Sequence, residues 1–261
     1  MARDARARIV SFTALVLAGS RGGVDPLADY AGVTDKAMIE IGGRTMLARV
    51  VDALRQAGAA RIAVVVSSDV VRRHAEQLGV DVIAGAAGPS ASAALGFAQL
   101  GAPLLVTTAD HALLDPAWVT RFLADVPRDA DVAVLLARRD VIEQAVPDPK
   151  RTYLRFADGA WSGCNLFYLA TPKAAAAIAL WQRVEADRKR PWRIVGRLGP
   201  RLLWRYLSGR LTLAEGLAHI GTLASVNARM VASPFGLAAV DVDKPADLDL
   251  VRGLIERSRA G

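Results

Sequence analysis

Lysine and aspartate side chains occur in this sequence at places where phosphate chemistry could be carried out. Asp110 closely follows the apolar run 104–108, and Asp243 follows the apolar run 237–242. Carboxylates just past a buried strand commonly hold hard cations such as Mg²⁺, and a lysine such as Lys36 can neutralise phosphate charge. Each residue alone has a simpler role, because an aspartate can cap a turn and a lysine can form a solvated ion pair.

A glycine-rich segment, residues 19–23 with the sequence Gly-Ser-Arg-Gly-Gly, follows the apolar run 12–18. Glycine lets backbone N–H groups approach a phosphate closely, so the segment could surround a triphosphate. It matches neither the G-x-G-x-x-G pattern of dinucleotide-binding proteins nor the P-loop pattern. A tight turn that needs glycine only for its backbone angles accounts for the segment equally well.

The elements that must position these residues alternate along the first half of the chain. We expect strands at 12–18, 62–66, 80–84, 104–108 and 132–137, and helices at 44–57, 69–78, 90–100 and from Pro116 onward, with Asp115 as the N-cap. Apolar strands alternating with helices predict an α/β fold with a mostly parallel sheet covered on both faces. Ligands of such sheets bind outside the carboxyl ends of the strands, which is where Asp110 and Asp243 are expected.

The second half of the chain is less regular. We expect strands at 151–156, 165–169 and 237–242, and helices from the Thr171-Pro172 pair to about residue 187, from the capping box of Thr212 and Glu215, and at 245–259. The sequence contains no internal repeat and no low-complexity linker. We therefore predict a single domain over residues 1–261, with a basic helical insert at about 172–222.

Composition and charge limit the class of protein. With 261 residues, 52% of them hydrophobic and 23% charged, the chain cannot be disordered, collagenous or a disulfide scaffold. The formal net charge of +7 favours anionic partners, but it does not distinguish nucleotides, nucleic acids and acidic lipids. The single cysteine, Cys164, and the lack of an export signal indicate a cytoplasmic protein. The uncharged stretch 82–109 is interrupted by glycine and proline, so we do not expect a transmembrane helix there.

Four segments together resemble nucleotidyltransferases of the glycosyltransferase-A-like fold. This group includes the molybdenum-cofactor guanylyltransferases, or MobA-like NTP transferases, and the sugar-phosphate and alditol cytidylyl- and uridylyltransferases. The segments read LVLAGSRGG, DKAMIEIGGRTML, LLVTTADHALLD and VDVDKPADLDLV, in the order of the family. The resemblance implies a three-layer, Rossmann-like α/β fold. It also implies a Mg²⁺-dependent enzyme that transfers a nucleoside monophosphate from GTP or CTP to a phosphorylated small molecule and releases pyrophosphate.

The resemblance also implies roles for individual residues. Lys36 and Arg21 would neutralise the phosphates as catalytic residues, Asp110 and Asp243 would hold Mg²⁺, and Asn165 would lie on the acceptor side. The nucleotide would be bound by Leu17, Ala18, Gly19, Ser20, Gly22 and Gly23 around the triphosphate, and by Ser90 and Ser92 near the base or ribose. The chain departs from the family pattern at Ser20, Val24 and Ala112.

Several functions are compatible with these features. The first is a molybdopterin guanylyltransferase-like reaction, and the second is cytidylyl transfer that activates a sugar, alditol or lipid head-group phosphate. A nucleotide-binding module without turnover is the alternative outside the enzymes. A nucleic-acid-binding protein is disfavoured because no known reader motif is present, and a glycosyltransferase because no D-x-D follows a strand in the middle of the sheet.

A basic segment lies within the predicted insert. Residues 188–214 contain eight lysines and arginines and no acidic residue, with tryptophan, tyrosine and leucine interleaved. This mixture resembles an interfacial helix that is attracted to anionic lipid. We expect the segment to help bind an anionic acceptor, which could be lipid-linked or close to a membrane, so that residues 188–210 could contact an anionic membrane. A solvated basic face whose apolar side packs on the core fits the segment equally well.

Overall fold

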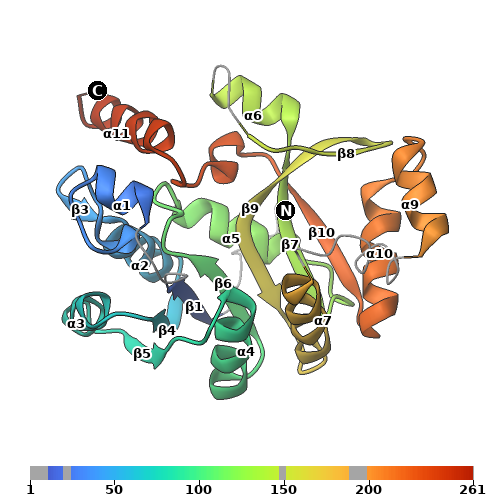
Figure 1. The fold of residues 1–261 in the computed structure, drawn as a ribbon, viewed down its shortest axis with the longest axis horizontal. Coiled ribbons are helices and arrows are strands. Elements are labelled where there is room, and N and C mark those ends of the chain that lie inside the picture. Colours follow the sequence, from blue (N-terminus) through green and yellow to red (C-terminus); the bar gives the residue numbers. More distant parts are fainter. Residues whose placement is uncertain (1–10, 20–24, 147–150, 188–198, 261) are drawn as a thin grey trace, which may run out of the picture.

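The computed structural model describes residues 11–19, 25–146, 151–187 and 199–260. A single eight-stranded sheet organises them, in the order β10-β7-β9-β6-β1-β4-β5, with β8 paired to β9 (Figure 1). The strands are β1 (Phe12–Ala18), β4 (Ala59–Val66), β5 (Asp81–Ala84), β6 (Leu104–Thr108), β7 (Val132–Arg138), β8 (Leu154–Phe156), β9 (Gly159–Leu169) and β10 (Ala228–Ser233). Strand β9 pairs antiparallel with β6, β7 and β8, and the other pairs described in this sheet are parallel. The prediction of a mostly parallel α/β sheet is therefore confirmed.

Helices cover both faces of the sheet (Figure 1). Along β1, the side chains of Ala14 and Val16 point into one core together with residues of α2, α3 and α5, while Leu15 points into another with residues of α4 and α7. This alternation follows from the two-residue period of a strand and produces the three layers. The helices are α1 (Pro26–Tyr30), α2 (Met46–Gln56), α3 (Asp69–Gln77), α4 (Pro89–Leu100), α5 (Pro116–Asp125), α6 (Arg139–Ala145), α7 (Ala174–Ala186), α9 (Pro200–Leu207), α10 (Leu213–Ala224) and α11 (Pro245–Ala260).

Local sequence signals place several helix ends correctly. The Asp115 carboxylate accepts a hydrogen bond from the N–H of Ala117 at the start of α5. Thr212 and Glu215 form the expected capping box of α10. Helix α4 approaches β1 so closely that a Cβ on Gly96 would lie 2.4 Å from a methyl carbon of Leu15. A larger residue at this position would have to displace the fully buried side chain of Leu15.

The prediction of a last strand over residues 237–242 is wrong. The segment begins with a 3-10 helix, η2 (Gly236–Ala239), and continues as extended chain outside the sheet. The free edge of β7 is occupied instead by β10, which the periodicity of the sequence did not reveal. The segment passes close to α6 at Gly236, because a Cβ there would lie 2.3 Å from the carbonyl oxygen of Val141. An apolar run cannot form a strand when no sheet edge is available to pair with it.

Two further boundaries differ from expectation for local reasons. Residues 44–45 form β3 (Arg44–Thr45), which pairs with β2 (Glu40–Ile41), so α2 starts at Met46. The hydroxyl of Thr171 donates to Asp131 at 2.6 Å and does not cap α7, which begins three residues later. None of the described helices is long and apolar enough to cross a lipid bilayer.

Candidate active site

Lys36, Asp110 and Asp243 meet at the carboxyl edge of the sheet. The Lys36 ammonium nitrogen lies 2.7 Å from Oδ2 of Asp110 and 2.5 Å from Oδ1 of Asp243. The two carboxylates are separated from the lysine by 74 and 207 positions in the sequence. The tertiary structure thus brings together the three residues that sequence analysis assigned to phosphate and metal binding, although their roles in turnover stay predictions.

A small hydrophobic core holds these three residues in place. It joins the segment around η1 (Lys36–Met38) and the β2–β3 hairpin to α11, with Ile39, Ile41 and Val242 fully buried in it. The N–H of Val242 donates to the main-chain carbonyl of Asp110 at 3.1 Å. Because of this contact, the chain end that carries Asp243 lies alongside the end of β6.

The residues on either side of the lysine and the aspartates are also fixed. The carboxylate of Asp35 accepts hydrogen bonds from the hydroxyls of Thr34 and Ser68, so it is not the partner of Lys36. The Thr108 hydroxyl donates to Oδ1 of Asp110 at 2.5 Å. The Asp247 carboxylate accepts from the N–H groups of residues 243 and 244 and caps the start of α11. Such contacts restrict the rotamers of the site before any ligand binds.

The electrostatics of the site favour a cation between the carboxylates. Burial alone would lower the pKa of Lys36, but the charges and hydrogen bonds of Asp110 and Asp243 outweigh burial and raise it. Burial raises the pKa of Asp110, against the opposing effect of Lys36. The ammonium therefore stays charged, and the Asp110 carboxylate is costly to keep ionised without a nearby positive charge.

The same two carboxylates form a suitable donor set for Mg²⁺. Two carboxylate oxygens already converge on one cationic atom, Nζ of Lys36. In the described part of the chain, no three His, Cys, Asp or Glu residues are grouped as a metal site. Mg²⁺ bound with a nucleotide needs only one or two carboxylates, because phosphate oxygens and water complete its octahedron. Asp110 and Asp243 fit that kind of site.

A second polar cluster is centred on Asp241, two residues before Asp243 in the sequence. Oδ1 of Asp241 is 2.5 Å from Nη1 of Arg151, and its Oδ2 accepts a hydrogen bond from Nδ2 of Asn165 at 2.9 Å. Burial alone would raise the pKa of Asp241, but Arg151 outweighs it and the pKa is lowered. Asn165 reaches this position from an irregularity in the β7–β9 pairing, where its φ is 48°. Bulges commonly redirect a side chain in this way.

Sequence analysis assigned Asn165 to this side of the site but missed Arg151 and Asp241. One signal could have identified Asp241: in an extended chain, residues two apart point to the same side, so Asp241 accompanies Asp243. Arg151 had no local signal, because it lies outside the helices and strands, three residues before the short strand β8. What holds its side chain in place is the ion pair with Asp241, which lies 90 positions away in the sequence.

The expected triphosphate loop begins at the same edge of the sheet. Leu17 pairs with Thr108 of β6, and the carbonyl of Leu17 accepts a hydrogen bond from the N–H of Ala109. Ala18 and Gly19 continue from there, next to the end of β6. The four remaining predicted residues of the loop lie outside the described part of the chain, namely Ser20, Arg21, Gly22 and Gly23.

Comparison with known proteins identifies the family. Residues 14–198 match the model of the MobA-like NTP transferase domain. The chain belongs to this family. A curated relative, 2-C-methyl-D-erythritol 4-phosphate cytidylyltransferase of Rhodococcus opacus, is 33% identical over 158 residues, which cover 53% of this chain and 70% of the relative. The expected family and enzyme class, a nucleotidyltransferase, are confirmed.

Solved structures agree with this assignment. A hypothetical transferase from Thermus thermophilus is 29% identical, with a TM-score of 0.78 over 91% of this chain and 99% of its own. The 2-C-methyl-D-erythritol 4-phosphate cytidylyltransferase of the same species is 18% identical, with a TM-score of 0.54 over 94% of this chain and 99% of its own. The second likeness concerns the fold alone.

The two serines predicted to contact the base or ribose lie at the start of α4 in this nucleotidyltransferase. The N–H of Ser90 donates to Oε2 of Glu185 on α7 at 3.1 Å. The hydroxyl of Ser92 accepts a hydrogen bond from the N–H of Ala86 at 3.1 Å. Both serines are buried, and these contacts fix the turn that precedes α4. Their role in nucleotide binding stays a prediction.

The buried His111 and Cys164 are poor candidates for a covalent role in the nucleotidyltransferase. Burial lowers the pKa of His111 to about 4, and its ring packs 6.0 Å from that of Trp118. Burial raises the pKa of the Cys164 thiol to about 12. Both groups are therefore neutral near pH 7, and His111 is a packing residue, as expected of an isolated histidine.

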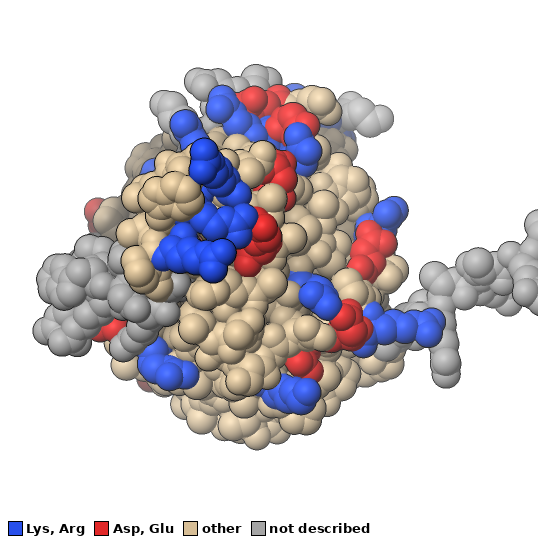
Figure 2. Space-filling model, turned by 90° about the vertical axis from the view of Figure 1, so that its right-hand side faces the viewer, with Lys and Arg blue, Asp and Glu red and all other residues tan. Residues whose placement is uncertain are grey.

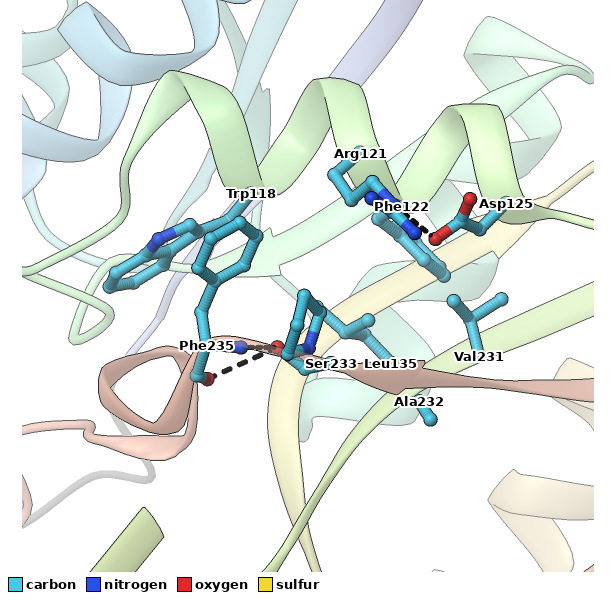
Figure 3. A pocket seen from close by; sticks show the side chains of 10 residues that line it. Trp118, Arg121, Phe122, Asp125, Leu135, Val231, Ala232, Ser233 and Phe235 are labelled. Atoms are coloured by element: carbon cyan, nitrogen blue, oxygen red, sulfur yellow. Dashed lines mark hydrogen bonds and ion pairs between the residues drawn. The ribbon is translucent and has the colours of Figure 1, made fainter. Parts of the chain in front are cut away.

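A narrow hollow between α5 and β10 is not part of the site. Trp118 and Phe235 stack there with their ring centroids 6.1 Å apart, and Arg121 pairs with Asp125 at its rim (Figure 3). The hollow is too narrow to admit a water molecule. We interpret it as a packing seam of the nucleotidyltransferase.

Proposed function

We propose that this nucleotidyltransferase transfers CMP from CTP to a small phosphorylated acceptor and releases pyrophosphate. The observation that carries the proposal is the Lys36 ammonium held between Asp110 and Asp243 at the carboxyl edge of the sheet. The choice of a cytidylyl group as the group transferred is supported by the curated relative, which is a 2-C-methyl-D-erythritol 4-phosphate cytidylyltransferase. Guanylyl transfer to molybdopterin, the other candidate, is separated from it by the experiment below.

The reaction needs alignment and charge neutralisation more than a protein nucleophile. An oxygen of the acceptor phosphate attacks the α-phosphorus of CTP, the bond between that phosphorus and the bridging oxygen breaks, and pyrophosphate leaves with the bond electrons. Lys36 would donate to phosphate oxygens once the nucleotide draws its ammonium from the carboxylates. Asp110 and Asp243 would hold Mg²⁺, which when bound neutralises charge on the α-phosphate and the leaving phosphates.

Arg151 and Asn165 would line the acceptor side. Both are hydrogen-bonded to Asp241, two residues from the proposed metal ligand Asp243. An arginine guanidinium binds phosphate with two parallel hydrogen bonds, so Arg151 is suited to the acceptor phosphate. The Asp241 carboxylate would keep both side chains oriented while the acceptor is absent.

The proposal is tested by calorimetry with ATP, GTP, CTP and UTP, with and without Mg²⁺, on the wild type and on Asp110→Asn. We expect CTP to bind preferentially, with at least a tenfold loss in the variant. Asp129→Asn is the matched control, because Asp129 is exposed, pairs with Arg229 and precedes β7 at the opposite edge of the sheet. Its CTP affinity should equal that of the wild type.

Turnover is followed as pyrophosphate release, first with 2-C-methyl-D-erythritol 4-phosphate and then with molybdopterin. Release with CTP and the first acceptor supports the proposal. Preference for GTP with turnover on molybdopterin would replace it with the guanylyl reaction. Preserved nucleotide binding with no release for any phosphorylated acceptor would indicate a binding module, and absence of nucleotide binding would refute the proposed site.

A further inference from the structure

Helix α9 exposes the apolar side chains that an amphipathic helix normally buries. None of its residues is buried, and Leu207 and Trp204 are 74% and 58% exposed. A surface helix of a globular protein usually turns its apolar stripe toward the core. In the described part of the chain, Leu202 and Leu203 are half-buried while Trp204 and Leu207 are left uncovered, so packing on the body accounts for only part of the apolar side of α9.

The other sides of α9 are already used to attach it to the body of the protein. The ring of Tyr206 packs edge-on against Phe156 of β8, with centroids 5.5 Å apart. Nη2 of Arg205 lies 2.7 Å from the Glu215 carboxylate at the start of α10. Successive residues of a helix point about 100° apart around its axis. Because Arg205 and Tyr206 face the body of the protein, Trp204 and Leu207 point away from it. The orientation of the apolar side is therefore set by the attachment of the helix.

Positive charge accompanies this exposed side. Arg201 is exposed at the start of α9, and the guanidinium of Arg210 lies 5.3 Å from the ring centre of Trp204. Figure 2 faces the side of the molecule that carries α9 and shows Lys and Arg in its upper part, with Asp and Glu side chains among them. Residues 188–198 of the basic segment lie outside the described part of the chain. Since residues 199–214 include no acidic residue, the surface of α9 is suited to an anionic partner.

We propose that α9 and Arg210 form a docking surface for an anionic lipid bilayer. Trp204 and Leu207 enter the boundary between head groups and acyl chains, and Arg201 and Arg210 lie at the level of the lipid phosphates. Tryptophan is well suited to this boundary because its ring is apolar and its N–H is polar. The proposal goes beyond the transfer reaction and does not depend on which nucleotide or acceptor the enzyme uses.

The exposed leucine favours lipid over other anionic partners. An aliphatic side chain gains free energy only where it leaves water for an apolar environment, and the backbone of a nucleic acid offers phosphates but no such environment. A second copy of this chain is disfavoured because two arginine-rich surfaces repel each other. An anionic bilayer offers both hydrocarbon and negative charge, close enough together for one side of a single helix to contact both.

The test is flotation of the full chain with phosphatidylcholine vesicles, with and without about 30% phosphatidylglycerol, at low salt. We expect the wild type to float only with the anionic vesicles. The partition coefficient of the double variant Trp204→Ser/Leu207→Ser should fall roughly tenfold or more. The partition coefficient of Arg201→Ala/Arg210→Ala should fall by about fivefold for each arginine removed. Val70→Ser, on the remote α3, removes an exposed apolar residue outside the proposed surface and should float like the wild type.

Circular dichroism and pyrophosphate release establish that each variant is folded. Because α9 lies outside the transfer site, release in solution should be unchanged in both double variants. Absence of flotation of the wild type with anionic vesicles would overturn the proposal. Equal flotation of Trp204→Ser/Leu207→Ser would also overturn it, because binding would then come from net charge. Binding to duplex DNA without vesicle binding would assign the surface to nucleic acid.

Discussion

Replacing Lys36 with methionine should have opposite effects on turnover and on metal binding. The ammonium lies within 2.7 Å of both an Asp110 oxygen and an Asp243 oxygen, so these oxygens are at most about 5 Å apart. Without the lysine, two negative charges at that distance repel each other by about 3 kcal/mol at an effective dielectric constant near 20. Solvent reaches Asp243, which is 56% exposed, and reduces this to about 1–2 kcal/mol.

A divalent cation relieves that repulsion. In the absence of nucleotide, Lys36→Met should therefore bind Mg²⁺ roughly tenfold more tightly than the wild type, for which the ammonium competes. Turnover should fall by about 10²–10³-fold, the usual effect of removing one charge-stabilising donor from a transition state. Methionine keeps a similar length and apolar stem, so packing changes little.

The measurements are calorimetric titration with Mg²⁺ alone and initial rates of pyrophosphate release at saturating nucleotide and Mg²⁺. Lys173→Met is the matched control, because this exposed lysine precedes α7 at the opposite edge of the sheet. Weaker Mg²⁺ binding by Lys36→Met would refute the competition between lysine and metal. Turnover within about threefold of the wild type would refute the catalytic role of the lysine.

Three further predictions concern stability and reactivity. Gly96→Val should lower the free energy of unfolding by about 1–3 kcal/mol in urea titrations, because its side chain would overlap β1; Gly163→Val, with no atom within 4 Å of its Cβ, should cost much less. The thiol of Cys164, with its pKa raised to about 12, should not react with a thiol reagent at pH 8 until the protein unfolds. Because the pKa of Asp241 is lowered in the folded protein, its ionised carboxylate stabilises the fold at pH values above about 3.9, the pKa of the unfolded state. This stabilisation is lost as the pH falls through the lower pKa of the folded state. Arg151→Met should therefore flatten the loss of stability below about pH 4, measured by urea unfolding at each pH.

Short-range signals in the sequence predicted much of the fold. Strands β1 and β6 have the predicted bounds, because strands buried on both faces read as continuous apolar runs. The starts of α5 and α10 also agree, because Asp115, Thr212 and Glu215 satisfy the first N–H groups of a helix from within a few residues. In each case the residues that determine the structure are neighbours in the sequence.

Elements whose pairing is non-local were predicted less well. Residues 237–242 have the composition of a strand, but β10 occupies the available edge of β7, so they form a 3-10 turn and extended chain. The strand predicted over 165–169 is part of the longer β9, whose ends depend on three partner strands. Which segment pairs with which edge is decided by the whole sheet, because main-chain groups are the same for every residue.

The candidate site combines both kinds of information. The types of Lys36, Asp110 and Asp243, and their positions after apolar runs, follow from the sequence, and the family resemblance assigned their chemistry. Their convergence on one cationic atom depends on the packing of α11 against the β2–β3 hairpin. The cluster of Arg151 and Asp241 likewise exists only in the folded chain, as does the outward side of α9. The sequence by itself determined which chemical groups are available and which local elements carry them. Tertiary structure alone decided which groups meet, because distances between residues far apart in the chain depend on how the sheet and its helices pack.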